Sequence, residues 1–254
     1  MRRERPDILF AYTIKSVIYG GLAARLSRVA RVYSLITGLG SVFVAAGALA
    51  AIAAHGVGSL YRLALSHSDR VLFQNPDDRD VFVRRGLVDV DKTVLVPGSG
   101  VNLDRFPARP LPAGPVRFLL IARLLVDKGV REYAEAASRL KRRHPEVTFT
   151  LVGPAEDRHP RAITRPELEA WCRDGVVDYA GATDDVRPYL EQCTVYVLPS
   201  YREGTPRSVL EALATGRKAV IPEPTYGTQL QDLAIQGHAG EGRMHITYSE
   251  RKVE

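Results

Sequence analysis

The stretch RFLLIARLLVDKGVREYAEAASRL (117–140), followed by TFTLVG (148–153), predicts the fold of the chain. Residues 117–122 are almost continuously apolar, which is typical of a strand buried on both faces of a parallel sheet. A helical repeat of 3.6 residues follows in the apolar positions Val130, Tyr133, Ala134, Ala137 and Leu140. The next apolar run, 148–152, ends at a Gly-Pro pair. Strand, helix and strand in this order predict a βαβ unit.

The same alternation continues toward the C-terminus of the chain. Short apolar runs predict strands at Val176–Tyr179, Val195–Leu198 and Lys218–Ile221. Helices are predicted between them at Pro166–Arg173, Asp184–Gln192 and Pro206–Thr215. Beyond residue 222 the pattern fades into Gly, Gln and charged residues, so we expect residues 223–254 to form an irregular tail.

Toward the N-terminus the pattern is similar. Strands are predicted at Asp7–Ala11, Arg31–Ile36, Arg70–Gln74 and Thr93–Val96. Helices are predicted at Ser16–Val29, in a long stretch that ends near His67, and at Asp77–Arg85. Prolines and glycines crowd residues 97–115, which favours a boundary near Leu111. We therefore expect an α/β protein with two Rossmann-like lobes, 1–111 and 112–222, whose parallel sheets face a cleft.

Composition fits a globular protein and does not by itself select a function. The 254 residues are 45% hydrophobic and 25% charged, which excludes a disordered or coiled-coil chain. The net charge of +6 suits phosphate-bearing ligands, nucleic acid or an anionic membrane. The longest apolar run, Val42–Ala54, is shorter than the roughly 20 residues that span a bilayer. It predicts a buried or interfacial helix.

The sharpest local motif is SYREGTPRSVLE, residues 200–211, which follows a predicted buried strand. Thr205 suits the N-cap of a helix and Pro206 its first position. The first-turn N–H groups of such a helix bind anions such as a diphosphate. Gly204 would let a ligand approach the backbone closely.

Two acids of this motif, Glu203 and Glu211, can accept hydrogen bonds from sugar hydroxyls. Beside an anion site they would fit a nucleotide joined to a sugar. The structural alternative stays open, because Glu211 can pair with Arg207 one turn earlier and Glu203 can be a solvated loop acid.

A second motif supplies positive charge. Arg123 follows the strand at 117–122 and Lys128 precedes the next helix. If the sheet is parallel, both look into the same crevice as Glu203. A guanidinium and an ammonium there would neutralise a departing diphosphate. We expect no metal, because the cysteines and histidines lack metal-ligand spacing.

These segments resemble the retaining glycosyltransferases of family 4, which have the GT-B fold. The resemblance runs from about residue 5 to residue 219, and Glu203 and Glu211 match the family's E-x7-E signature. It implies that Glu203 contacts the donor sugar, Glu211 the ribose, and Arg123 and Lys128 the donor diphosphate. The remaining donor-binding positions that it implies are Gly153, Gly181, Gly204, Thr205 and Pro206.

The first lobe resembles a capsule and glycan-assembly branch of that family. The residues that carry this likeness are AYTIK (11–15), IYGG (18–21), LITGLG (35–40) and FQNPD (73–77). They imply a bacterial transferase that adds a hexose or N-acetylhexosamine to a polyprenyl-diphosphate-linked sugar. Lys15, Thr37 and Gly38 would lie on the acceptor side. The implied setting is cytoplasmic, with possible peripheral binding at the inner face of the membrane.

The chain also departs from the pattern of the family that it resembles. We expect a chain shortened at both ends, with an incomplete first lobe. The main expectation is transfer from a UDP-sugar to a lipid-linked or saccharide acceptor with retention, without cofactor or metal. The alternative is a catalytically incomplete nucleotide-sugar-binding fragment. A nucleotide-sugar epimerase would need acid and base groups near the sugar, and the sequence offers no convincing set. No basic patch interleaved with aromatic residues supports nucleic-acid binding.

Overall fold

The computed structural model describes residues 4, 6–38, 48–98, 100–156, 158–201, 203 and 205–221, with only the backbone described for 48–54. It divides into two compact units, Met1–Gly98 and Ser99–Glu254. The predicted irregular tail, 223–254, and the loop residue Gly204 lie outside the described residues.

The division between the units falls earlier than the expected position near Leu111, because residues 106–110 pack on the second unit. Phe106 is buried in a core cluster of that unit. The amide of Arg109 donates to the carbonyl of Thr215 at 3.1 Å. The proline-rich segment therefore belongs, in part, to the second unit.

The first unit contains four strands and three α-helices among its described residues. They are β1 (Ile8–Tyr12), α1 (Ile14–Ser27), β2 (Arg31–Ile36), α2 (Ala48–Leu65), β3 (Arg70–Phe73), α3 (Pro76–Arg84), the 3₁₀ turn Val90–Lys92 and β4 (Thr93–Leu95). Each predicted strand of this lobe is present within two residues of its expected bounds.

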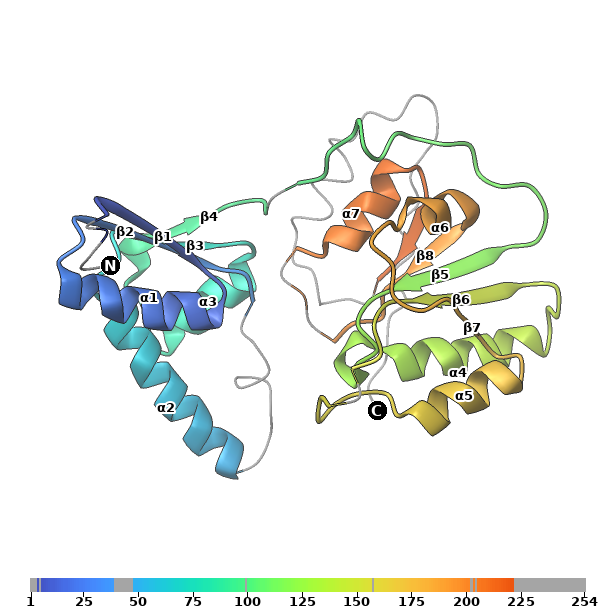
Figure 1. Ribbon diagram of the computed structural model, residues 1–254, viewed down its shortest axis with the longest axis horizontal. Coiled ribbons are helices and arrows are strands. Elements are labelled where there is room, and N and C mark those ends of the chain that lie inside the picture. The colour runs from blue at the N-terminus through green and yellow to red at the C-terminus, as the bar shows by residue number, and fades with distance from the viewer. Residues whose placement is uncertain are drawn as a thin grey trace. The chain divides into compact units, whose positions relative to one another are not determined.

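Its sheet has the sequential order β1-β2-β3-β4, and every pairing is parallel. Right-handed crossovers in a constant direction put all connecting helices on one face, as Figure 1 shows for α1, α2 and α3. Alternate side chains of β1 point away from those helices. Ile8, Phe10 and Tyr12 are 61%, 52% and 59% exposed. One face of this sheet is therefore packed and β1 is open on the other.

The second unit contains five strands and four α-helices among its described residues. They are β5 (Arg117–Ile121), the 3₁₀ turn Val126–Lys128, α4 (Val130–Lys141), β6 (Thr148–Val152), α5 (Arg165–Arg173), β7 (Asp178–Tyr179), α6 (Arg187–Gln192), β8 (Val195–Val197), α7 (Arg207–Ala214) and β9 (Lys218–Val220). The βαβ unit predicted around residues 117–152 is present as β5-α4-β6.

Its parallel sheet has the order β7-β6-β5-β8-β9, so the chain reverses direction across the sheet at β5. Consequently α4 and α5 cover one face, and α6 and α7 cover the other (Figure 1). Successive residues of β5 pack on opposite faces of the sheet. Leu119 belongs to the hydrophobic cluster on the α6–α7 side, and Leu120 belongs to the cluster under α4. The predicted parallel α/β architecture is confirmed.

Candidate functional site

The reversal at β5 makes one edge of the second sheet a natural ligand site. β5 and β8 are neighbours, yet the chain leaves β5 for one face and β8 for the other. The two loops leave adjacent carboxyl ends toward opposite faces, and the space between their first residues, the β5–β8 crevice, is where doubly wound sheets bind their ligands. The loop after β5 carries Arg123 and Lys128, and the loop after β8 carries Glu203.

The two loops are fixed against each other by the backbone. The amide of Tyr201 and the hydroxyl of Ser200 donate to the carbonyl of Asp127 at 3.0 and 3.1 Å. Gly129 has φ +70°, and a Cβ built on it would lie 2.1 Å from the carbonyl oxygen of Pro199. Only glycine permits this approach, so the crevice is rigidly framed on both sides.

Lys128 and Glu203 meet in this crevice. The Lys128 Nζ donates to the Glu203 Oε1 in an ion pair between residues 75 positions apart in the sequence. Their side chains are only 21% and 17% exposed. From a parallel sheet we expected Arg123 and Lys128 to face the same crevice as Glu203, and Lys128 and Glu203 do form a pair.

Arg123 belongs to the same edge but has a different partner. Its guanidinium lies 3.7 Å from a carboxylate oxygen of Glu156, in the loop after β6, and its side chain is 54% exposed. The loose spacing and exposure leave this side chain free to turn toward an anion. The structure thus brings Lys128, but not Arg123, into contact with Glu203.

α7 begins one residue later than the sequence predicted. Pro206 has φ −73° and ψ 107°, an extended conformation, so it occupies the N-cap and the helix starts at Arg207. The prediction of Thr205 as N-cap is therefore wrong. Since proline has no side-chain acceptor, this cap makes no side-chain hydrogen bond.

The first turn of α7 is instead anchored by a buried tyrosine of β8. The Tyr196 hydroxyl lies 2.7 Å from the Ser208 Oγ and 3.2 Å from the Ile121 carbonyl, at the end of β5. Burial raises the pKa of this phenol well above its usual range, and the charges of Glu203 and Glu211 raise it further. Tyr196 therefore ties the first turn of α7 to the end of β5.

Glu211 is a buried acid, with 8% of its residue surface exposed. Burial raises the pKa of its carboxyl, and the charge and hydrogen bond of Arg207 oppose that shift. The Arg207 Nε donates to the Glu211 Oε1 at 3.0 Å, so the intrahelical pair considered from the sequence is present. Arg207 is two-thirds exposed, and the carboxylate that it holds is largely buried.

The predicted donor-side glycines join neighbouring loops of the same edge. The amide of Gly153, after β6, donates to the carbonyl of Gly181, after β7, at 2.8 Å. A Cβ on Gly153 would lie 1.9 Å from the carbonyl oxygen of Ala122. Gly181 has φ +78° and open space around it, so a ligand can approach its backbone.

The predicted acceptor-side residues all belong to the first unit. Lys15 lies in the first turn of α1, and Thr37 and Gly38 follow β2 at the carboxyl edge of the first sheet. A Cβ on Gly38 would meet nothing within 4 Å.

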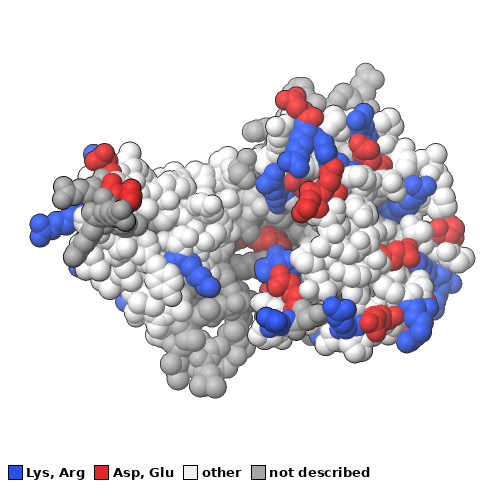
Figure 2. All heavy atoms as spheres, viewed as in Figure 1, with Lys and Arg blue, Asp and Glu red and all other residues white. Residues whose placement is uncertain are grey.

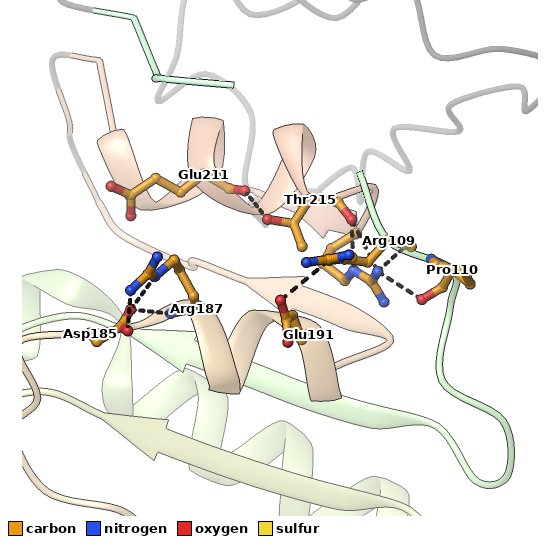
Figure 3. Close-up of polar contacts among 8 residues, drawn as sticks. Arg109, Pro110, Asp185, Arg187, Glu191, Glu211 and Thr215 are labelled. Atoms are coloured by element: carbon orange, nitrogen blue, oxygen red, sulfur yellow. Dashed lines mark hydrogen bonds and ion pairs between the residues drawn. The ribbon is translucent and has the colours of Figure 1, made fainter. Parts of the chain in front are cut away.

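The sequence reasoning missed Arg217, which is 1% exposed and follows the glycine that ends α7. Its guanidinium donates to main-chain carbonyls of Arg109, Pro110, Cys193 and Thr215. Figure 3 shows the linker residues Arg109 and Pro110 beside the end of α7, with Thr215 bonded back to the Glu211 carbonyl. Arg217 therefore ties segment 106–110 to the helix that carries Glu211.

The described residues also bear on two other kinds of site. They contain no group of three or more His, Cys, Asp or Glu side chains that could hold a metal ion. Within the same ranges, no helix has the length and apolar character needed to cross a bilayer. The expectation of chemistry without a metal stays a prediction.

The fold belongs to the GT-B class. Sucrose-phosphate synthase from Thermosynechococcus elongatus superposes with a TM-score of 0.72 at 21% identity, over 88% of this chain and 57% of that one. Anabaena Alr3699/HepE in complex with UDP-glucose gives a TM-score of 0.67 at 18% identity, over 85% and 60%.

The sequence defines the family within that class. Residues 115–241 match the model of the glycosyl transferases group 1, and residues 1–75 match that of the glycosyl transferase 4-like proteins. The first match spans half of the chain, and the chain belongs to this glycosyltransferase family. The predicted GT-B fold and family 4 resemblance are confirmed.

Two relatives are named for acceptors linked to undecaprenyl diphosphate. The chain is 31% identical over 231 residues to the N,N'-diacetylbacillosaminyl-diphospho-undecaprenol alpha-1,3-N-acetylgalactosaminyltransferase of Campylobacter jejuni. It is 25% identical over 242 residues to the UDP-Gal:alpha-D-GlcNAc-diphosphoundecaprenol alpha-1,3-galactosyltransferase of Escherichia coli. The matches cover 85% and 87% of this chain and 59% of each relative.

Proposed function

We propose that this chain carries the donor site of a glycosyltransferase. The enzyme would move a hexose or N-acetylhexosamine from a UDP-sugar to a lipid-linked or saccharide hydroxyl, with retention of configuration. The observation that carries the proposal is the convergence of Lys128 and Glu203 at the β5–β8 crevice, inside a family match to glycosyltransferases.

The proposed chemistry is electrostatic. Bond cleavage at the sugar leaves negative charge on the departing diphosphate, and donors positioned in advance stabilise that charge best. Lys128, Arg123 and the first-turn amides of α7 are the proposed donors to the diphosphate. Glu203 would accept from sugar hydroxyls and Glu211 from the ribose, which orients the donor. The loops containing Gly153 and Gly181 would border the nucleoside.

The proposed acceptor is a polyprenyl-diphosphate-linked sugar, as in the named relatives. Lys15, Thr37 and Gly38 are the proposed acceptor-side residues. Because such an acceptor is held in a bilayer, we propose peripheral binding at an anionic membrane surface on the cytoplasmic side. Exposed Tyr19 and Leu26 on α1, near Arg25, are compatible with this.

A transfer assay tests the proposal. The purified chain is incubated with radiolabelled UDP-sugars and vesicles that contain an undecaprenyl-diphosphate-linked N-acetylhexosamine. We expect a lipid product one sugar longer, at least about tenfold less of it with Glu203→Ala, and an unchanged yield with the surface control Glu135→Ala. UDP binding without transfer would favour the binding-only alternative, and a chain that binds no UDP or UDP-sugar would contradict both.

A further inference from the structure

The ion pair of Lys128 and Glu203 places a negative charge next to the proposed diphosphate site. The proposed function gives Lys128 the phosphate and Glu203 the sugar, yet the structure shows them bonded to each other. An ammonium has three N–H donors, so Lys128 can hold Glu203 and a phosphate oxygen together. Two acceptors on one ammonium lie roughly 5 Å apart at ordinary hydrogen-bond lengths.

At that distance from the phosphate, the Glu203 carboxylate has opposite effects on the binding of UDP and of a UDP-sugar. UDP ends in a phosphate with up to two negative charges at neutral pH, since the second pKa of a phosphate monoester is about 6. In a UDP-sugar the same phosphate is a diester with one negative charge, and the attached sugar brings hydroxyls that donate to a carboxylate. Repulsion therefore opposes UDP more strongly, while hydrogen bonding favours the UDP-sugar.

The burial of the pair makes this effect strong. With side chains 21% and 17% exposed, Lys128 and Glu203 are screened less by solvent than the neighbouring pair of Arg123 and Glu156, at 54% and 35%. The loop that presents Glu203 is bonded to the Asp127 carbonyl through Ser200 and Tyr201, next to Lys128, which keeps the loops of the two charges together.

We propose that Glu203, held by Lys128, is a specificity-determining residue that selects the UDP-sugar over UDP and so favours release of the nucleotide after transfer. This inference rests on the proposed function of the site. It assigns to Glu203 a discrimination between donor and product in addition to its contact with the sugar.

Calorimetric titration of wild type and Glu203→Gln with UDP, and with UDP-glucose, UDP-galactose and UDP-N-acetylglucosamine, tests the inference. Glutamine keeps the shape of the side chain and removes its charge. We expect UDP to bind about tenfold more tightly to the variant. The UDP-sugar that wild type binds best should bind several-fold more weakly. Opposite signs for the two ligands cannot arise from general damage to the fold.

Two further variants serve as controls. Glu135→Gln removes the same charge from an exposed pair with Arg139 on α4, and both affinities should stay unchanged. Glu203→Asp keeps the charge and should retain the weaker binding of UDP.

The outcomes separate this inference from the proposed function. If wild type binds neither UDP nor any of the three UDP-sugars, the proposed function fails. If wild type binds them but Glu203→Gln weakens both, leaves both unchanged or tightens both, the proposed function stands and the selection by Glu203 is wrong.

Discussion

The two sheets are both parallel, yet they are built differently. The first runs in sequence order, β1-β2-β3-β4, with its described helices on one face; the second reverses at β5 and carries helices on both faces (Figure 1). Charged side chains are also distributed differently. On the face drawn in Figure 2, Lys, Arg, Asp and Glu are interspersed over the second unit and sparse over the first.

This difference teaches where a site can form. A sheet whose crossovers all go one way has no point at which neighbouring loops diverge, whereas a reversal creates one. The candidate donor residues lie around the reversal, in loops that pack backbone to backbone. Among the described residues of the first unit, no ion pair comparably buried to that of Lys128 and Glu203 is seen.

The largest expected effect is on stability, and it compares two glycines that each lie in a loop after an inner strand of its sheet. Gly129→Ala should destabilise the second unit by about 3–5 kcal/mol, because the added Cβ would collide with the Pro199 carbonyl in a left-handed conformation. Gly38→Ala, after β2, also strains the backbone at φ +157° but meets no atom within 4 Å, so it should cost less, about 1–2 kcal/mol. Urea unfolding monitored by Trp171 fluorescence measures the first change, because this tryptophan is the only one in the chain and lies in the second unit. Equal losses of stability in the two glycine variants would mean that the close approach of Gly129 to Pro199 does not hold the two loops together.

A smaller difference is expected between two arginines that bind main-chain carbonyls. Arg217→Met should cost about 3 kcal/mol, because several buried carbonyls lose their donor. Arg62→Met in the first unit removes bonds to Gly86 and Arg85 that are exposed to water, and should cost less than about 1 kcal/mol. Unfolding monitored by Trp171 fluorescence measures the stability of Arg217→Met, and unfolding monitored by circular dichroism measures that of Arg62→Met. A small loss of stability in Arg217→Met would show that water takes over the hydrogen bonds to these carbonyls.

The smallest effect is the pH dependence contributed by Glu211. Burial raises the pKa of its carboxyl in the folded state, so the folded chain holds the proton more tightly than the unfolded chain. Stability from this group is present at low pH and is lost as the pH rises through the folded pKa. Glu211→Gln should therefore be slightly more stable than wild type at pH 7, with a difference that vanishes toward pH 4. A loss of stability at pH 7 would mean that the pair with Arg207 outweighs burial.

Local pattern was enough to predict most of the fold. The apolar runs that become β5 and β6, and the helical repeat that becomes α4, are complete within a short window of sequence. In a parallel sheet the strand ends lie at one edge, so a meeting of Lys128 with Glu203 could be expected although 75 residues separate them. The site was predictable to the extent that it depends on where parallel strands end.

Contacts that depend on one particular loop conformation could not be predicted. Arg123 has Glu156 as its partner, which no spacing indicates. The N-cap of α7 is Pro206 and not Thr205, because Pro206 has an extended backbone conformation in place of the helical one expected at the first position. Arg217 looks like a surface cation in the sequence, since its burial requires carbonyls of the distant residues Arg109 and Pro110.

The most direct test of the central claim is the binding of UDP to the crevice between β5 and β8. Calorimetry should show saturable binding of UDP to the wild-type chain and at least about tenfold weaker binding to Lys128→Ala, because a buried charge-assisted contact to the diphosphate is lost. Lys141→Ala, at the far end of α4, should bind like wild type, since this lysine bonds the Gly175 carbonyl and no other described residue. Equal losses in both variants, or none in Lys128→Ala, would contradict the placement of the nucleotide at this edge.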